Sequence, residues 1–197
     1  YAILGYRNGT LIYDVSTNSE NPILISDILG PSNNDYYFHR DYKTYADHLY
    51  IVNEMTGMDE GMQVVDLSPL PLGEPIKRST YTGISQSHNL WIDTDRGYGY
   101  IERMYPENIH IIDLSNPDLP LKNASFNFSN GNNCHDIFTL NNMAYISEGY
   151  NNRFGIYDIS EITNPLLLAG IPSFGYAHNA WLNGAGTHLV TGEETIG

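Results

Sequence analysis

Cysteine, basic residues and long apolar runs are all scarce in this chain of 197 residues. The single cysteine, Cys134, excludes an intrachain disulfide framework and has no second thiol with which to form a metal site. Nine Lys and Arg residues against 23 Asp and Glu residues give a net charge of −14. Nucleic-acid binding needs a clustered basic surface, so no nucleic-acid partner is expected. No apolar run reaches the length of a membrane span, so none is expected in this chain.

Helical periodicity is also missing from the sequence. The 18 Gly and 10 Pro residues interrupt most windows long enough to form a helix, which predicts a nearly all-β protein. Abundant Tyr with sparse Lys is typical of secreted or surface β proteins, so we expect an extracellular or cell-surface location.

What the chain does contain is one pattern repeated four times: a His, an aromatic residue three positions later, and an acid 13 to 15 residues after the His. The histidines are His39, His88, His135 and His178, and the acids are Glu54, Glu102, Glu148 and Glu193. The histidines lie 49, 47 and 43 residues apart. A period in the forties with several short strands predicts the four-stranded antiparallel blades of a β-propeller.

The repeat divides the chain into one β-propeller region, residues 1–197. It predicts a partial blade over 1–38, blades over 39–87, 88–134 and 135–177, and a partial blade over 178–197. Both ends fall inside a blade, so we expect this to be a piece of a larger propeller.

The repeated His and Glu are the candidate binding residues. Antiparallel pairing brings the start of a blade's first strand beside the end of its second, which predicts a ring of imidazoles and carboxylates at one mouth of the central channel. One interpretation is structural, with each imidazole satisfied by a carboxylate or carbonyl. The other is functional, with the ring holding a polar ligand or a metal ion; the sequence predicts no other cofactor and leaves the metal unknown.

The aromatic residue of each repeat has the opposite strand parity from the His. We therefore expect these residues to pack between blades, as core. They are Tyr42, Trp91, Phe138 and Trp181.

Each third strand is expected to end in a phrase of Asp, an aliphatic residue and Ser. A short Asp side chain at this position can accept a hydrogen bond from a backbone N–H of the following turn. Metal binding by these residues is the alternative, although each acid stands alone. They are Asp14, Asp66, Asp113 and Asp158.

Residues that depart from the repeat are the best candidates for a specific function, because a repeated feature is expected to serve the fold. The first copy has Arg40-Asp41 after its His, and the last copy carries a second acid, Glu194. The sequence motifs of common enzyme classes are mostly absent: the chain has no Gly-rich phosphate loop, no G-x-S-x-G elbow and no H-E-x-x-H. No residue is therefore assigned as catalytic.

The motifs resemble those of the choice-of-anchor B family, secreted bacterial propellers with LVIVD-type repeats. The resemblance rests on Gly61-Met62-Gln63-Val64-Val65-Asp66-Leu67, Ser87-His88-Asn89, Ile109-His110-Ile111-Ile112-Asp113-Leu114-Ser115-Asn116-Pro117, His135-Asp136 and His178-Asn179-Ala180-Trp181-Leu182. It covers about residues 39 to 197 and implies a bacterial cell-surface propeller, without implying a reaction. The family's Cys-x-Gly-Gly is absent before the third-strand phrase, and Glu193-Glu194 stands where the family has Asp-Glu.

Two functions fit these features. The first is an extracellular binding or interaction module that contacts a protein or glycan at the cell surface. The alternative is a propeller hydrolase or lyase that acts on a polysaccharide or small ester at the channel mouth.

Overall fold

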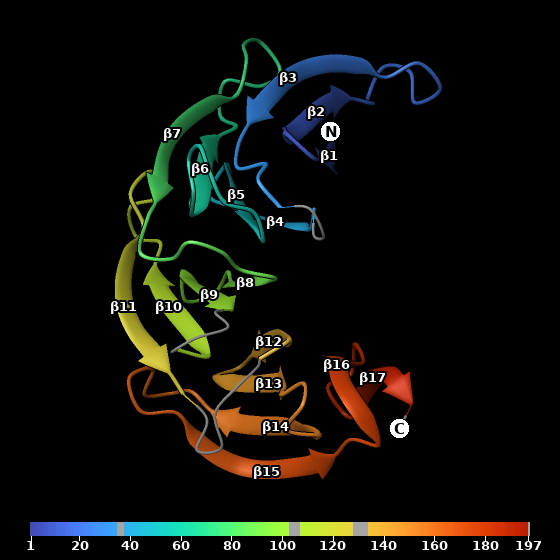
Figure 1. The fold of residues 1–197 in the computed structure, drawn as a ribbon, viewed down its shortest axis with the longest axis vertical. Helices are drawn as coiled ribbons and strands as arrows, with labels where there is room; N and C mark the ends of the chain where they lie inside the picture. Colours follow the sequence, from blue (N-terminus) through green and yellow to red (C-terminus); the bar gives the residue numbers. More distant parts are fainter. Residues whose placement is uncertain (35–37, 103–106, 128–133, 197) are drawn as a thin grey trace. The chain divides into compact units, whose positions relative to one another are not determined.

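The computed structural model describes residues 1–34, 38–102, 107–127 and 134–196, and within these ranges the chain forms 17 strands and no helix. The strands pair in antiparallel order into five sheets, each a meander in which sequential strands are neighbours. Figure 1 shows these meanders along the chain. Within the described part of the chain, no helix is long and apolar enough to cross a membrane.

The chain divides into two compact units. Unit 1 comprises Tyr1–His88 and the short segment Asn116–Pro120. It contains a three-stranded sheet of β1 (Ala2–Tyr6), β2 (Gly9–Asp14) and β3 (Ile23–Leu29), and a four-stranded sheet of β4 (Arg40–Tyr45), β5 (His48–Asn53), β6 (Met62–Asp66) and β7 (Ile76–Tyr81).

Unit 2 comprises Asn89–Ser115 and Leu121–Gly197. Its first sheet contains β8 (Leu90–Asp93), β9 (Tyr98–Glu102), β10 (Ile109–Asp113) and β11 (Leu121–Phe126). Its second contains β12 (Asp136–Leu140), β13 (Met143–Ser147), β14 (Arg153–Asp158) and β15 (Leu166–Pro172). The last two strands, β16 (Gly175–Leu182) and β17 (Leu189–Ile196), form a hairpin.

Tight hairpin turns connect the first two strands of two blades. Asn141 and Asn142 have φ values of 51° and 60°, and Ala46 and Asp47 have φ values of 48° and 58° at the equivalent turn. Two successive residues with positive φ match the twist of the flanking strands. Asn and Asp adopt this conformation at low cost, whereas Ala does so less readily.

A register shift recurs between the last two strands of each of the four sheets that have three or four strands. It falls between the two β-forming residues that precede the Asp: Ile12/Tyr13, Val64/Val65, Ile111/Ile112 and Ile156/Tyr157. A bulge at this position increases the local twist of the pair. The repeated sequence phrase thus encodes a repeated irregularity of the backbone.

The Asp of the same phrase bonds to the turn that follows it, as predicted. In all four copies Oδ1 accepts a hydrogen bond from the backbone N–H of the Ser two residues later, at distances from 2.7 to 2.8 Å. The acids are Asp14, Asp66, Asp113 and Asp158. These bonds account for the recurrence of Asp and Ser at the strand ends.

Buried apolar residues from neighbouring sheets form the core of each unit. In unit 1, Ile12 packs with Leu49, Ile51 and Val65. In unit 2, a larger cluster includes Ile111, Ile137, Ile146 and Tyr157. Alternate residues of the second and third strands supply most of these side chains, which fits the period-2 pattern of a strand.

The repeated aromatic residues lie in different environments. Phe138 is buried, and Tyr42 and Trp91 pack partly buried against the two cores. Trp181 is 51% exposed, so the expectation that all four are core is wrong for Trp181. Its ring lies 4.3 Å from that of Phe138 and 5.1 Å from that of Trp91, so one edge of this aromatic cluster remains open to solvent.

Candidate functional site

Backbone pairing places the His of each repeat within one residue of its Glu in all four copies, as two of them illustrate. The Glu54 N–H donates to the carbonyl of His39 at 3.2 Å, and the His135 N–H donates to the carbonyl of Ser147, next to Glu148, at 2.8 Å. The side chains of the four copies nevertheless have different partners. A continuous ring around a channel therefore stays a prediction.

In unit 1, the first two histidines stack on each other. The rings of His39 and His88 lie 4.2 Å apart and nearly parallel. His88 Nδ1 is 3.0 Å from Oε1 of Glu54. Desolvation, followed by the neighbouring His88, lowers the pKa of His39. This group is an imidazole pair held by one carboxylate.

In unit 2, the Glu148 carboxylate bonds within its own sheet. It is fully buried and accepts two hydrogen bonds from Arg153, while its other oxygen accepts one from the Tyr157 hydroxyl at 2.7 Å. A Cβ on Gly155 would lie only 2.3 Å from Oε1, so glycine is required beside this carboxylate. These contacts give Glu148 a structural role.

The Glu102 carboxylate is also buried, close to the thiol of Cys134. Burial first, and then the negative charge of Glu102, raise the pKa of the Cys134 thiol. A thiol that stays protonated is a poor nucleophile. Cys134 is therefore part of the packing rather than a reactive group.

The last two histidines form a second cluster of ligand-type side chains, together with Glu194. The rings of His135 and His178 lie 4.3 Å apart, and His135 Nδ1 is 2.7 Å from the carbonyl oxygen of His178. One ligand atom from each of these histidines and from Glu194 lies within 4.8 Å of the other two. Among the described residues, this is the group whose geometry suits a metal ion.

Glu193, the acid predicted from the repeat, bonds elsewhere. Its carboxylate accepts hydrogen bonds from the Ser173 hydroxyl and from the backbone N–H of Phe174. Adjacent residues of a strand point to opposite faces, which explains why Glu194 reaches the histidines instead. The second acid at this position was the sequence signal for it.

Aromatic side chains flank this histidine cluster. The Tyr176 ring packs edge-on against His135 at 5.3 Å and against Tyr150 at 4.6 Å. Tyr150 is 74% exposed. Gly149, with φ of +45°, lets the Tyr176 ring approach, because a Cβ there would lie 3.1 Å from it. Neither tyrosine belongs to the repeat, so the repeat pattern did not identify them.

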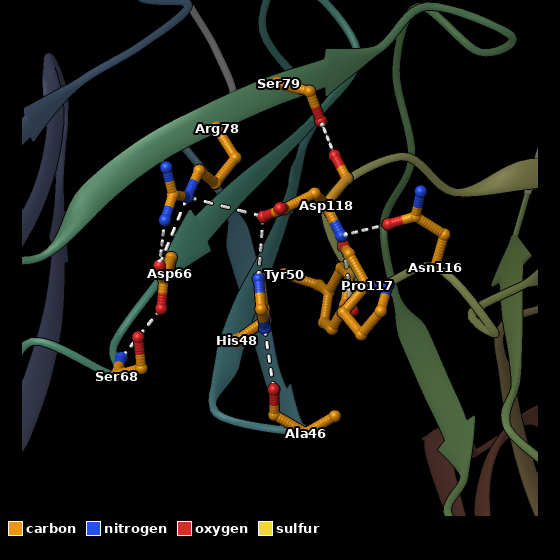
Figure 2. Close-up of polar contacts among 10 residues, drawn as sticks. All are labelled: Ala46, His48, Tyr50, Asp66, Ser68, Arg78, Ser79, Asn116, Pro117 and Asp118. Carbon is orange, nitrogen blue, oxygen red and sulfur yellow. Dashed lines mark hydrogen bonds and ion pairs between the residues drawn. The ribbon is translucent and has the colours of Figure 1, made fainter.

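A second polar cluster, also outside the repeat, lies in unit 1 (Figure 2). Asp118, in the short segment 116–120, accepts a hydrogen bond from His48 at 2.9 Å and lies 3.4 Å from Arg78. Arg78 also bonds to Asp66 at 2.6 Å. Hydrogen bonds from Ser68, with further contributions from Arg78, lower the pKa of Asp66 to about 2. These bonds tie the segment to β5 and β7, and Arg78 links β7 to β6, which indicates a structural role.

No family model matches the sequence, and no curated protein matches it. Two solved structures align over 98% of the chain with a TM-score of 0.74 and 13% identity: a functionally unknown protein from Desulfotomaculum acetoxidans DSM 771 and a protein from Lactobacillus plantarum. The chain spans 59% and 60% of their lengths.

A third similar structure is a Bacteroides uniformis ATCC 8492 protein, provisionally described as a 6-phosphogluconolactonase. It aligns over 85% of this chain and 49% of its own, with a TM-score of 0.64 and 13% identity. At such identities the likeness concerns the fold alone. Together with the four-stranded meanders, it shows that this chain has the all-β fold of a β-propeller with antiparallel blades.

Proposed function

We propose that this chain is a binding module of a bacterial extracellular or cell-surface β-propeller and that it contacts a glycan. The observation that carries the proposal is the exposed Tyr150 ring, packed edge-on against Tyr176 beside the histidine cluster. Aromatic rings offer a rigid apolar face, and the adjacent imidazoles and carboxylate offer hydrogen bonds. A sugar needs both kinds of contact.

Size and charge favour a neutral glycan over the other partners. A stable protein interface buries about 800 Å² on each side, much more than two tyrosine rings supply. The net charge of −14 disfavours an anionic polysaccharide. A protein partner at the cell surface remains the second outcome of the test.

The extracellular location and membership of the choice-of-anchor B family are part of the same proposal. They rest on the resemblance of segments such as Gly61–Leu67 and Ile109–Pro117 to that family's repeats. A reading frame that encodes a secretion signal and a surface-anchoring segment would support them. A frame without a secretion signal would contradict them.

The alternative is an enzyme, a hydrolase or lyase that acts at the same histidines on a polysaccharide or small ester. The structural likeness to a protein described as a lactonase favours testing it, because a lactone is a cyclic ester. The bonds that hold Glu148 within its own sheet speak for the binding module, since they occupy the carboxylate of the repeat that lies beside His135 along the backbone.

The test is a glycan array with the purified 197-residue chain, followed by calorimetric titration of each hit. Tyr150→Ala should abolish binding of a neutral glycan, while Phe38→Ala, which removes an exposed aromatic ring from unit 1, should leave it unchanged. Absence of glycan binding, or binding that survives Tyr150→Ala, would overturn the proposal. Turnover of a lactone or polysaccharide that is lost in His178→Ala would favour the enzyme.

A further inference from the structure

We infer that His135, His178 and Glu194 bind a divalent transition-metal ion of the zinc type. The three side chains come from the residue just before β12, from β16 and from β17, all within unit 2. Metal binding here does not depend on the partner that Tyr150 and Tyr176 contact. The sequence predicted that the repeated His and Glu could hold a metal ion without indicating which one, and this inference names the ion and its ligands.

The positions of the ligand atoms fit such an ion. One atom of each residue lies within 4.8 Å of the others. Ligand atoms in a tetrahedral zinc site with bonds of about 2.0 Å lie roughly 3.3 Å apart, so the three must draw together by at most about 1.5 Å. The Glu194 side chain is exposed and has three rotatable bonds, so it can make this adjustment.

The tautomer of His135 is fixed in the form that a metal requires. Its Nδ1 lies 2.7 Å from the His178 carbonyl oxygen, which can only accept a hydrogen bond. Nδ1 therefore carries the proton, and the lone pair of the neutral ring is on Nε2. A metal-binding His typically donates its other N–H to a backbone carbonyl in this way.

The charge around the cluster favours a cation. The Glu194 carboxylate supplies a negative charge at the site itself, and the chain as a whole carries a net charge of −14. A negative potential attracts and stabilises a divalent cation. Partial burial of the two imidazoles further limits screening by water.

The ligand set indicates which ions to expect. Two imidazoles and one carboxylate suit Zn²⁺, Ni²⁺ or Cu²⁺, whereas Ca²⁺ and Mg²⁺ prefer oxygen ligands alone. Three protein ligands leave the fourth tetrahedral position open for a water molecule or an outside ligand.

The experiment titrates zinc chloride into the full 197-residue chain, freed of any polyhistidine tag, in competition with a chromogenic chelator. We expect one equivalent of Zn²⁺ to bind with a dissociation constant of about 1 µM or tighter. His178→Ala and Glu194→Gln should each weaken binding by at least about tenfold.

Matched controls lie in the same hairpin. His188→Ala removes an exposed imidazole near the turn, and Glu193→Gln removes the neighbouring carboxylate that bonds to Ser173. Both should retain wild-type affinity. Thermal melts without metal establish that each variant is folded. Failure of the wild-type chain to bind Zn²⁺, or equal affinity in a folded His178→Ala and Glu194→Gln, would overturn the inference.

Discussion

The Arg153 guanidinium donates two hydrogen bonds to one oxygen of the Glu148 carboxylate, from Nε at 3.0 Å and from Nη2 at 2.7 Å. The carboxylate is fully buried. Replacing Arg153 by Met would leave this charge without a counterion, which we expect to lower the free energy of unfolding by about 3 to 5 kcal/mol. Urea denaturation measures the loss.

Lys122→Met is the control for this prediction. Lys122 pairs with Glu107 at 2.7 Å, but its side chain is 43% exposed. An exposed pair contributes at most about 1 kcal/mol. Equal losses in Arg153→Met and Lys122→Met would contradict the structural role of the buried pair.

The two tryptophans of the repeat should differ in their contribution to stability. Trp91 packs against the unit 2 core and donates to the Thr139 hydroxyl at 2.8 Å, so Trp91→Ala should cost about 3 to 5 kcal/mol. Trp181 is 51% exposed, so Trp181→Ala should cost about half as much. A larger loss of unfolding free energy in Trp181→Ala than in Trp91→Ala, measured by denaturant melts, would contradict the exposed position of Trp181.

The hairpin turns predict a reciprocal pair of substitutions. Ala46 has φ of 48° at the position where the other turn has Asn141, with φ of 51°. Because Asn tolerates this conformation better than Ala, Ala46→Asn should stabilise the chain and Asn141→Ala should destabilise it, each by about 0.5 to 1 kcal/mol. Thermal melts that shift in the same direction for both would contradict the turn assignment.

Asp66 should make stability depend on pH under acidic conditions. Its pKa is lowered from 3.8 to about 2 in the folded chain, so its contribution is fully present above pH 3.8 and is lost as pH falls toward 2. Asp66→Asn should therefore flatten the pH dependence of stability between about pH 4 and 2.

Denaturant melts of the wild-type chain and of Asp66→Asn at several pH values between about 4 and 2 measure this prediction. If the dependence of stability on pH were the same in Asp66→Asn as in the wild-type chain, the lowered pKa of Asp66 would be refuted.

The repeat was sufficient to predict the strands and the strand-end turns. The Asp-aliphatic-Ser phrase predicted a local bond within three residues, and local bonds of this kind depend little on the rest of the fold. Pairing of adjacent strands was predictable for the same reason. The structure therefore confirms best those predictions that depend only on residues close together in the sequence.

Side-chain partners across strands were much less predictable. Nothing in the repeat indicated that Arg153 and Tyr157 would bond to Glu148, or that Glu194 rather than Glu193 would face the histidines. The choice between Glu193 and Glu194 depends on local register shifts between β16 and β17 and on which face each residue occupies. A shift of one residue exchanges the two faces, and sequence alone does not specify it.

We infer that the four histidine positions are not equivalent and that the cluster formed by the last two binds a ligand. Long-range ¹H–¹⁵N NMR of the histidine side chains, recorded before and after one equivalent of Zn²⁺, tests this inference most directly. We predict that the Nε2 resonance of His135 and one ring-nitrogen resonance of His178 shift, while those of His39, His88 and His188 do not. Equal shifts at all of these histidines, or no shift at His135 and His178, would contradict the claim.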